Sequence, residues 1–406
     1  MTAFSPLTIG PIELSNRFIK SGANENMYRR GYPTKALLKH HRDLAAGGIA
    51  LTTMAYAAVA KVGRTLPDQL WLRPDVIPHL KAITDAVHSE GGKISLQLTH
   101  GGSFVTSIFV PHRTISASGG LNVAGLFHGN FLQRAMNEKD MSTVIAQFAD
   151  GARMAREAGF DAVELHMGHG YLLNQFISPL SNNRKDEYGG SAENRVRFPA
   201  RVLRAVKEAV GSDLAVIAKI NVADGVRRGA TAEDAVVTAK VLEAAGADLL
   251  VLSGGRNVES TWFMFGSPMN QAEFAKVFKN QPLQRLLMKA AAAGTPKGLT
   301  FKEMYFEEYS RKVRAAVSMP LAYLGGIKSL DNVNRALAEG FDAVVMARVL
   351  LHDAALVNKF RDGSVRQSGC TSCNACIPQI YNQAGTYCVL NPPNDPALNE
   401  VRAADG

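Results

Sequence analysis

Short apolar runs alternate along the chain with longer segments in which apolar residues recur at helical spacing. The runs that we predict as strands are Phe18–Ser21, Ile49–Met54, Ile94–Leu98, Ala162–His166, Ala215–Ile220, Leu249–Leu252, Leu321–Leu324 and Ala343–Met346. Runs that are apolar throughout are typical of parallel strands buried on both faces. Because strand and helix alternate eight times, the pattern predicts an α/β protein, a (β/α)8 TIM barrel.

The segments between these runs predict amphipathic helices. The clearest are Val76–Ser89, Met141–Ala158, Ala192–Val210, Thr231–Ala245 and Asp331–Glu339. Glycine often closes such a helix, as at Gly159, Gly246 and Gly340, because glycine readily takes the left-handed conformation of a helix C-terminus. A doubly wound sheet is the alternative architecture, but no Gly-x-Gly-x-x-Gly follows a strand.

Two connections, at about 99–140 and 253–299, are unusually long for a barrel. Both leave the carboxyl ends of predicted strands, where barrel enzymes build their active sites. We therefore expect both to wall a pocket. The run Trp262–Phe265 in the second connection either lines that pocket or packs a lid onto the barrel.

The polar residues that follow the fourth run form the segment His166-Met-Gly-His169-Gly-Tyr171. This order places two imidazoles and a phenol just past the end of a strand. His166 and His169 can donate two N–H groups to one carbonyl oxygen, and Tyr171 can deliver a proton as a general acid. A His-x-x-His pair is also a metal motif, but zinc normally needs a third protein ligand. Carbonyl binding is therefore the favoured interpretation.

A candidate anion site lies where the seventh run ends in Gly325-Gly326 and the eighth is followed by Ala347-Arg348. Loops after the seventh and eighth strands of barrels commonly hold a phosphate through backbone N–H groups and a helix N-terminus. The two glycines let the backbone approach an anion, and Arg348 supplies positive charge. Ordinary turn chemistry explains each loop alone, but the two together predict a phosphate site.

The segment Gly159–Arg195 resembles the signature of the old yellow enzyme family, the FMN-dependent ene-reductases also called NADH:flavin oxidoreductases. Further matching motifs are Asn16-Arg17, Gln97-Leu-x-His100, the Gly-Gly pair and a group of C-terminal cysteines, so the resemblance covers most of the chain. It implies an FMN cofactor, NAD(P)H as reductant and an α,β-unsaturated carbonyl substrate. The substrate would take hydride from flavin N5 and a proton from Tyr171, with ping-pong kinetics on a shared flavin face.

The resemblance also assigns cofactor positions. Gln97 matches the flavin-amide position, and Lys219 matches the cationic position, where many relatives have Arg. The other matching flavin-contact positions are Ser21, Ala23, Asn24 and Ala55. An amide offers both a donor and an acceptor to the flavin, and a cation stabilises the negative charge that reduction brings to N1. A structural ion pair between Lys219 and Glu164 is the alternative, and the two are compatible. Ala347 stands where relatives typically have Gly, and its N–H remains available.

The four cysteines of the chain all lie in one C-terminal segment, at Cys370, Cys373, Cys376 and Cys388. Four thiolates suit a 4Fe–4S cluster, with zinc as the second choice of metal; the alternative to both is an empty structural remnant. The segment resembles that of the 2,4-dienoyl-CoA reductase and enoate reductase branch, although its middle spacing is two residues where that branch typically has three. We expect residues 1–365 to form the FMN-binding barrel, and 366–406 a Cys-rich extension packed on the barrel or trailing from it.

Composition limits the partners and the compartment. The 406 residues are 46% hydrophobic, enough for a large core, and the formal net charge of +9 comes from scattered Lys and Arg. A scattered basic surface does not favour nucleic acid as a partner. Because there is no signal peptide pattern, no membrane-length apolar run and little cysteine, we expect a cytoplasmic protein without a membrane segment. A small enone- or enal-type substrate is the expected partner, and a redox partner protein and a homo-oligomer stay open.

The sequence thus predicts an NAD(P)H-dependent FMN oxidoreductase of the ene-reductase type. One alternative is an electron-transfer or demethylase-type flavoprotein that a partner feeds through a 4Fe–4S cluster. The other is a phosphate-binding barrel without flavin, such as a lyase or isomerase.

Overall fold

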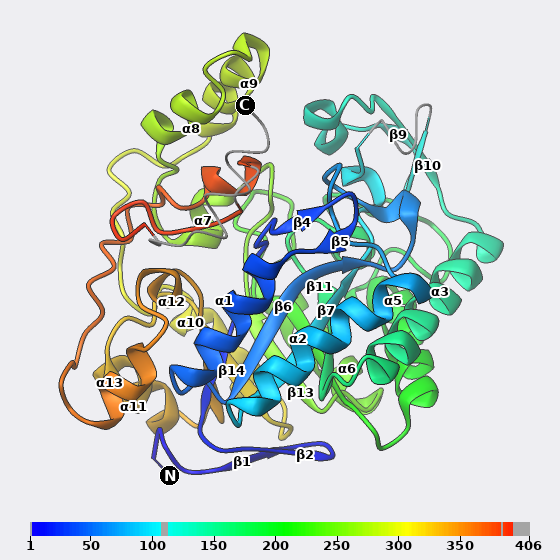
Figure 1. Ribbon diagram of the computed structural model, residues 1–406. Coiled ribbons are helices and arrows are strands. Elements are labelled where there is room, and N and C mark those ends of the chain that lie inside the picture. Colours follow the sequence, from blue (N-terminus) through cyan, green and yellow to red (C-terminus); the bar gives the residue numbers. More distant parts are fainter. Residues whose placement is uncertain (1, 107–112, 383–384, 393–406) are drawn as a thin grey trace.

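The core of the molecule is a closed barrel of eight parallel strands (Figure 1). The computed structural model describes residues 2–106, 113–382 and 385–392. The barrel strands are β3 (Phe18–Lys20), β6 (Leu51–Ala58), β7 (Lys93–Thr99), β11 (Ala162–Met167), β12 (Ala215–Asn221), β13 (Leu249–Ser253), β14 (Leu321–Leu324) and β15 (Ala343–Met346). Each pairs in parallel with the next strand along the chain, and β15 returns to β3. The predicted barrel fold is confirmed, and each predicted run overlaps one of these strands.

Strand β6 differs most from its predicted range, because it starts two residues later and extends to Ala58 instead of Met54. An irregularity between Met54 and Ala57 shifts its register with β7. The shift interrupts the regular pairing that the apolar run predicted. Ala55 and Tyr56 lie within this irregular stretch, and pairing with β7 resumes at Ala57 and Ala58 before the strand ends.

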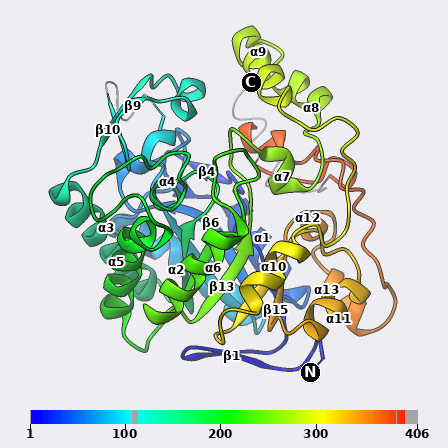
Figure 2. The ribbon, with the colours of Figure 1, turned by 180° about the vertical axis from the view of Figure 1, so that it is seen from behind.

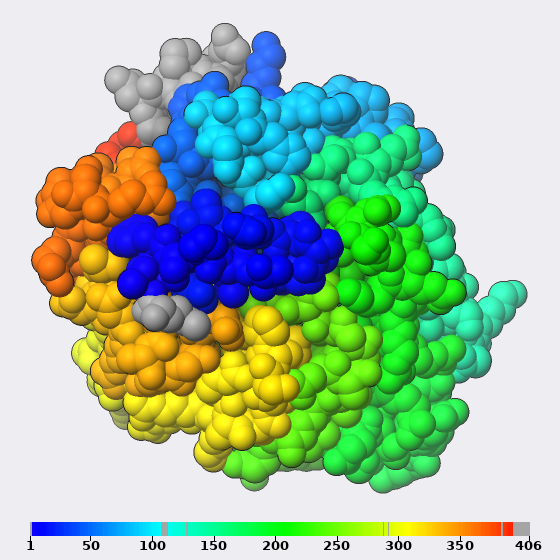
Figure 3. Space-filling view, turned by 90° about the horizontal axis from the view of Figure 1, so that it is seen from below, coloured from blue at the N-terminus to red at the C-terminus, as the bar shows by residue number. Residues whose placement is uncertain are grey.

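The amino end of the barrel is closed by the N-terminal hairpin, β1 (Leu7–Ile9) with β2 (Ile12–Leu14). Its apolar side chains join a layer of buried residues at the starts of the barrel strands, among them Ile19, Ala162 and Ile217. Seen from below, the N-terminal segment lies across the middle of this face (Figure 3). The interior is therefore filled with side chains, and the open end of the barrel is the carboxyl end.

Helices surround the barrel on its outside (Figures 1 and 2). They are α1 (Lys35–Ala46), α2 (Ile77–Ser89), α3 (Glu138–Glu157), α4 (Leu172–Ile177), α5 (Ala192–Val210), α6 (Ala232–Ala244), α10 (Glu307–Arg314), α11 (Leu330–Ala338), α12 (Arg348–His352) and α13 (Leu356–Arg361). The five predicted helices correspond to α2, α3, α5, α6 and α11. Asn137, Ser191, Thr231 and Ser329 act as N-caps, each accepting a hydrogen bond from a first-turn backbone N–H.

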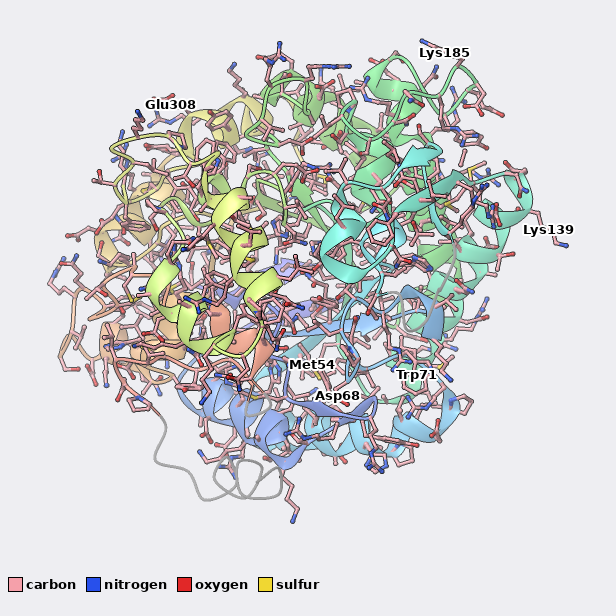
Figure 4. All side chains as sticks on the ribbon, turned by 90° about the horizontal axis from the view of Figure 1, so that it is seen from above. Met54, Asp68, Trp71, Lys139, Lys185 and Glu308 are labelled. Carbon is pink, nitrogen blue, oxygen red and sulfur yellow. The ribbon has the colours of Figure 1, made fainter. Side chains whose placement is uncertain are left out.

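The two long connections lie on opposite sides of the barrel mouth (Figure 4). The first forms a small sheet of β8 (Thr114–Ser116), β10 (Leu132–Ala135) and β9 (Gly120–Leu121). The second forms α7 (Thr261–Phe265), α8 (Gln271–Val277) and α9 (Pro282–Ala292). A further short hairpin, β4 (Tyr28–Arg29) with β5 (Tyr32–Pro33), follows β3. Both excursions therefore wall the open end of the barrel, as their place in the sequence predicted.

The chain returns to the mouth after α13. Asn26 Nδ2 donates to the Ile380 carbonyl at 2.7 Å, and the Thr386 N–H donates to the Glu25 carbonyl at 2.7 Å. The cysteine segment thus lies beside the loop that follows β3, with its short 3-10 helix at Pro378–Tyr381. Within the described ranges, none of the helices combines the length and the apolar character that crossing a membrane requires.

Candidate active site

A large cavity of about 570 Å³ opens at the carboxyl ends of the barrel strands. Its walls come from the strand ends, both long connections and the cysteine segment. The predicted site residues that line it are Ser21, Ala23, Asn24, Gln97, His166, His169, Tyr171, Lys219, Gly325, Gly326, Ala347 and Arg348. The fold therefore gathers two predicted sites, for carbonyl binding and for phosphate binding, in one space. That volume falls in the usual range for a small-molecule or cofactor site.

His166, near the carboxyl end of β11, is buried, and its Nδ1 has no hydrogen-bond partner among the described residues. Burial, and then the neighbouring His169 and Lys219, hold the pKa of its imidazole well below the usual value of 6.5. The ring is therefore neutral near pH 7. A neutral imidazole carries one N–H, so His166 has one donor to offer a ligand in the cavity.

His169 has a left-handed backbone, with φ of 60°, and its ring lies at a centroid distance of 5.0 Å from that of His166. Its N–H donates to Asn221 Oδ1 at 3.1 Å, and its Nε2 lies 2.8 Å from Ser253 Oγ. Burial, and then Lys219, lower the pKa of this imidazole to about 3. The structure thus holds two neutral imidazoles side by side, as a double hydrogen-bond donor requires.

Tyr171 lies beside the first imidazole, with 4.5 Å between its ring centroid and that of His166. Its hydroxyl donates to Tyr56 Oη at 3.2 Å, and Tyr56 Oη is 2.7 Å from Thr65 Oγ1. Burial, and then Tyr56, raise the pKa of Tyr171 well above 10. The phenol therefore keeps its proton at neutral pH and is available as a general acid.

The polar base of the cavity is formed by Lys219, Glu164 and Gln97, which are all buried. Lys219 Nζ donates to Ser21 Oγ at 2.9 Å and to the Gly22 carbonyl at 2.8 Å, and lies 3.6 Å from Glu164 Oε1. Gln97 Nε2 donates to the same carboxylate at 2.5 Å. The anticipated ion pair between Lys219 and Glu164 is present. Because only one of the two Nε2 hydrogens is engaged in this bond, Gln97 has its second N–H and its carbonyl oxygen to offer a ligand.

On the opposite side, Gly325 and Gly326 have φ of +132° and +81°, which disfavour residues with a Cβ. A Cβ on Gly325 would stand 2.8 Å from the Phe306 ring, so these loops have no room for side chains. The Arg348 guanidinium donates to the Phe265 carbonyl at 3.0 Å and to Asn374 of the cysteine segment. The predicted anion site thus combines a bare backbone with a cation held by two neighbouring loops.

One predicted contact residue has a different environment. Ala55 is completely buried, and its N–H donates to Glu25 Oε2 at 2.9 Å, whereas the next residue, Tyr56, lines the cavity. In the run Trp262–Phe265, Met264 and Phe265 line the cavity, and Phe263 packs against Phe306. Sequence reasoning missed Tyr56, Thr65, Ser253 and Asn257 as lining residues. Hydroxyl and amide residues in loops do not follow the hydrophobic periodicity that identifies helices and strands. Only their position just after a strand could have identified them as residues that line the cavity.

The four cysteines line one small cavity beside the large one, and Arg348 borders both. Cys370 and Cys388 are buried, Cys373 is exposed and Cys376 is intermediate. Burial raises the pKa of the Cys376 thiol to about 12. No group of three or more potential ligands within the described ranges is arranged to hold a metal ion.

Comparison with known proteins agrees with this geometry. The sequence pattern of the NADH:flavin oxidoreductase / NADH oxidase family matches residues 2–294, and the chain therefore belongs to this family. A pattern described as Histidine biosynthesis protein also matches residues 253–356, a minor part of the chain. The predicted family and the enzymatic class, an NAD(P)H:flavin oxidoreductase, are confirmed.

Three relatives illustrate the range of similarity. The 4,4'-dithiodibutanoate disulfide reductase of Rhodococcus erythropolis is 39% identical over 95% of this chain and 94% of its own length. The NADH oxidase of Thermoanaerobacter brockii is 28% identical over 96% of this chain, which spans only 56% of that relative. The solved structure of morphinone reductase in complex with tetrahydroNAD has a TM-score of 0.69 at 21% identity, covering 92% of this chain and 94% of that one. The last similarity shows the fold alone.

Family membership implies FMN as cofactor and NAD(P)H as reductant, and the cavity fits FMN. A Cβ on Gly22 would lie 2.6 Å from Gln97 Nε2 and 2.8 Å from Glu164 Oε1, so glycine here lets the backbone of the turn after β3 pack directly against the polar base of the cavity. Lys219 places a buried cation at the polar base, and the Gly325-Gly326 loop with Arg348 supplies anion donors. A flat polar ring system with a phosphate tail needs these features.

Proposed function

We propose that this enzyme uses NAD(P)H to reduce the C=C bond of α,β-unsaturated carbonyl compounds. The observation that carries the proposal is the arrangement of three rings. The ring centroids of the neutral imidazoles of His166 and His169 are 5.0 Å apart, and the ring centroid of Tyr171 lies 4.5 Å from that of His166. His166 and His169 donate two hydrogen bonds to the carbonyl oxygen and draw electron density from the conjugated bond. Tyr171 then donates its proton to the α-carbon.

Gln97, Lys219 and the turn Ser21–Asn24 would hold the isoalloxazine, and Gly325, Gly326, Ala347 and Arg348 its phosphate. FMN, when bound, supplies the hydride that it has received from NAD(P)H. Lys219 stabilises the negative charge of the reduced ring, and Glu164 keeps that cation in place. Because one cavity serves both the nicotinamide and the substrate, we expect ping-pong kinetics.

A turnover assay with product analysis tests the proposal. The purified protein is loaded with FMN and given NADPH and 2-cyclohexenone under anaerobic conditions, with cyclohexanone as product. Rapid-mixing absorbance separates reduction of the flavin by NADPH from its reoxidation by the enone. Flavin that is reduced by NADPH but not reoxidised by any enone or enal would reject this substrate class.

A second candidate is the reduction of an organic disulfide, because the Rhodococcus relative bears that name and matches over nearly the full length of both chains. Hydride would attack one sulfur and break the S–S bond. The attacked sulfur becomes one thiol and the other sulfur leaves as a thiolate. One proton from Tyr171, which solvent then replaces, converts that thiolate into the second thiol, so that two thiols form per NAD(P)H oxidised. The same flavin reoxidation assay with 4,4'-dithiodibutanoate, and thiol titration of the products, compares the two substrates directly.

We further propose that residues 366–406 form an extension of the barrel 1–365, in which the four cysteines bind a 4Fe–4S cluster. Their shared small cavity beside the large one supports this, and a redox partner protein would then have an entry point at the exposed Cys373. Iron and acid-labile sulfide analysis of anaerobically purified protein tests the cluster. Four irons and four sulfides per chain support it; zinc or no metal rejects it.

A further inference from the structure

Ser253, at the end of β13, is the only hydrogen-bond partner of the His169 ring among the described residues. It is 2% exposed, and its Oγ lies 2.8 Å from His169 Nε2. We propose that Ser253 is a positioning residue that selects the tautomer of His169. This inference rests on the proposed function, in which His169 donates an N–H to the substrate.

The argument begins with the charge of the ring. His169 is neutral, so one of its nitrogens carries the proton and the other accepts a hydrogen bond. Since Nε2 is engaged with Ser253, Nδ1 is the nitrogen that remains for a ligand. A donor at Nδ1 requires Nε2 to accept, and therefore requires the Ser253 hydroxyl to donate.

The opposite arrangement would place the proton on Nε2 and a lone pair on Nδ1. A lone pair directed at a carbonyl oxygen repels it, and His166 would then be left as a single donor. The hydroxyl of Ser253 can donate to Nε2 without any charge change, and the hydrogen bond it then makes stabilises the Nδ1–H tautomer, which offers the carbonyl a donor. Second partners of this kind commonly fix which imidazole nitrogen holds the proton.

The surrounding backbone keeps the ring in reach of Ser253. Asn221 and Ser253 are paired in the β12–β13 register. Asn221 Oδ1 accepts the backbone N–H of His169 at 3.1 Å, and Asn221 Nδ2 donates to the Gly255 carbonyl at 2.8 Å. Neighbouring positions on adjacent strands thus hold the main chain and the ring of one residue, which leaves the imidazole few alternative orientations.

The direct test is the tautomer itself, observed in long-range 1H–15N spectra of protein with 15N-labelled histidine at pH 7. The His169 signals are assigned by their loss in His169→Gln. The expected result is an Nδ1–H imidazole in the unsubstituted enzyme and a growing Nε2–H population in Ser253→Ala. An Nε2–H imidazole in the unsubstituted enzyme overturns the proposal. This readout does not depend on turnover, so it stays informative if the proposed substrate class is wrong.

A double-mutant cycle gives the functional test. Ser253→Ala should lower kcat/KM for the enone about tenfold, the usual size for one lost hydrogen bond. In a His169→Ala background the same change should have less than about a twofold effect, because no tautomer remains to select. Equal losses in both backgrounds would mean that Ser253 acts independently of His169 and would overturn the proposal. Ser310→Ala is the matched control: its Oγ in α10 has no hydrogen bond among the described residues, and kcat/KM should not change.

Discussion

The two ends of the barrel use charged residues in opposite ways. At the amino end, an aspartate immediately precedes each of β11, β13 and β15: Asp161, Asp248 and Asp342. They accept the backbone N–H of Ile94, Val216 and Leu321 at 2.8, 2.7 and 2.9 Å. Their cationic partners are Lys93, Lys207 and Arg314, at 2.9, 2.8 and 3.2 Å. Each carboxylate thus joins neighbouring strands, and its bonding capacity is used within the fold.

At the carboxyl end, some buried polar groups do not use all of their hydrogen-bonding atoms within the fold. His166 Nδ1 has no partner among the described residues, and the Lys219–Glu164 pair lies at 3.6 Å, beyond ordinary hydrogen-bond length. The turns are bare at Gly22, Gly325 and Gly326. Burying polar groups without full satisfaction costs free energy, so the comparison indicates that the amino end was built for stability and the carboxyl end for a ligand.

The largest expected effect is on chemistry at the carboxyl end. Tyr171→Phe should slow reoxidation of the reduced flavin by an enone about 10²–10⁴-fold, the usual contribution of a positioned general acid. Reduction of the flavin by NADPH should be unchanged, because that half-reaction needs no proton from the phenol. Rapid-mixing absorbance measures both half-reactions. Tyr56→Phe, which removes only the neighbouring hydroxyl, is the matched control and should have a much smaller effect; equal losses would assign the acid to another group.

Lys219→Met should destabilise the fold strongly. It leaves the Glu164 carboxylate buried without its cation, which typically costs about 3–5 kcal/mol. FMN content after desalting should fall, and urea unfolding should show the lost stability also in the apoprotein. Lys219→Arg retains the charge and should retain FMN. If Lys219→Met keeps both stability and FMN, the polar base of the cavity is not the cationic flavin site.

A change at the amino end should affect stability alone. Asp248→Ala removes the acceptor of the Val216 N–H and the partner of Lys207, and we expect a loss of about 1–3 kcal/mol. The lower part of that range applies if Lys207, which is partly exposed, regains water. Urea unfolding gives the loss, and kcat/KM of the folded enzyme should not change. Asp213→Ala, which breaks the exposed pair with Arg156, is the control and should cost less than about 0.5 kcal/mol.

The smallest effect concerns pH. Because burial lowers the pKa of His169 to about 3 from an ordinary 6.5, and holds that of His166 well below 6.5, neither ring takes up a proton in the mildly acidic range. The dissociation constant of a neutral ketone on the oxidised enzyme should therefore change less than about twofold between pH 8 and 5. Ligand titration followed by flavin absorbance measures it. Weakening centred near pH 6.5 would show that the imidazoles are solvated and titrate normally.

The fold was largely predictable because its determinants are local. Each barrel strand is a short apolar run between helices with amphipathic spacing, and these patterns are visible along the chain without any tertiary contact. The bounds of β6 were not predictable, because the shift between Met54 and Ala57 follows from pairing with β7. Most predicted site residues do line one cavity, since the carboxyl ends of parallel strands meet at one face. The predicted contact Ala55 is buried, whereas its neighbour Tyr56 lines the cavity. A sequence motif cannot tell which of two adjacent residues faces the cavity.

The sequence alone determined the class of fold, the pair of histidines with their tyrosine, and the bare glycine turns, because each depends on residue type and spacing. Only the tertiary structure decided the protonation state and the orientation of these groups. Burial makes the imidazoles neutral, a carboxylate from β11 orients Gln97 of β7, and a serine from β13 meets a histidine 84 residues away. Protonation, orientation and tautomer are properties of contacts between distant segments, and no local pattern encodes them.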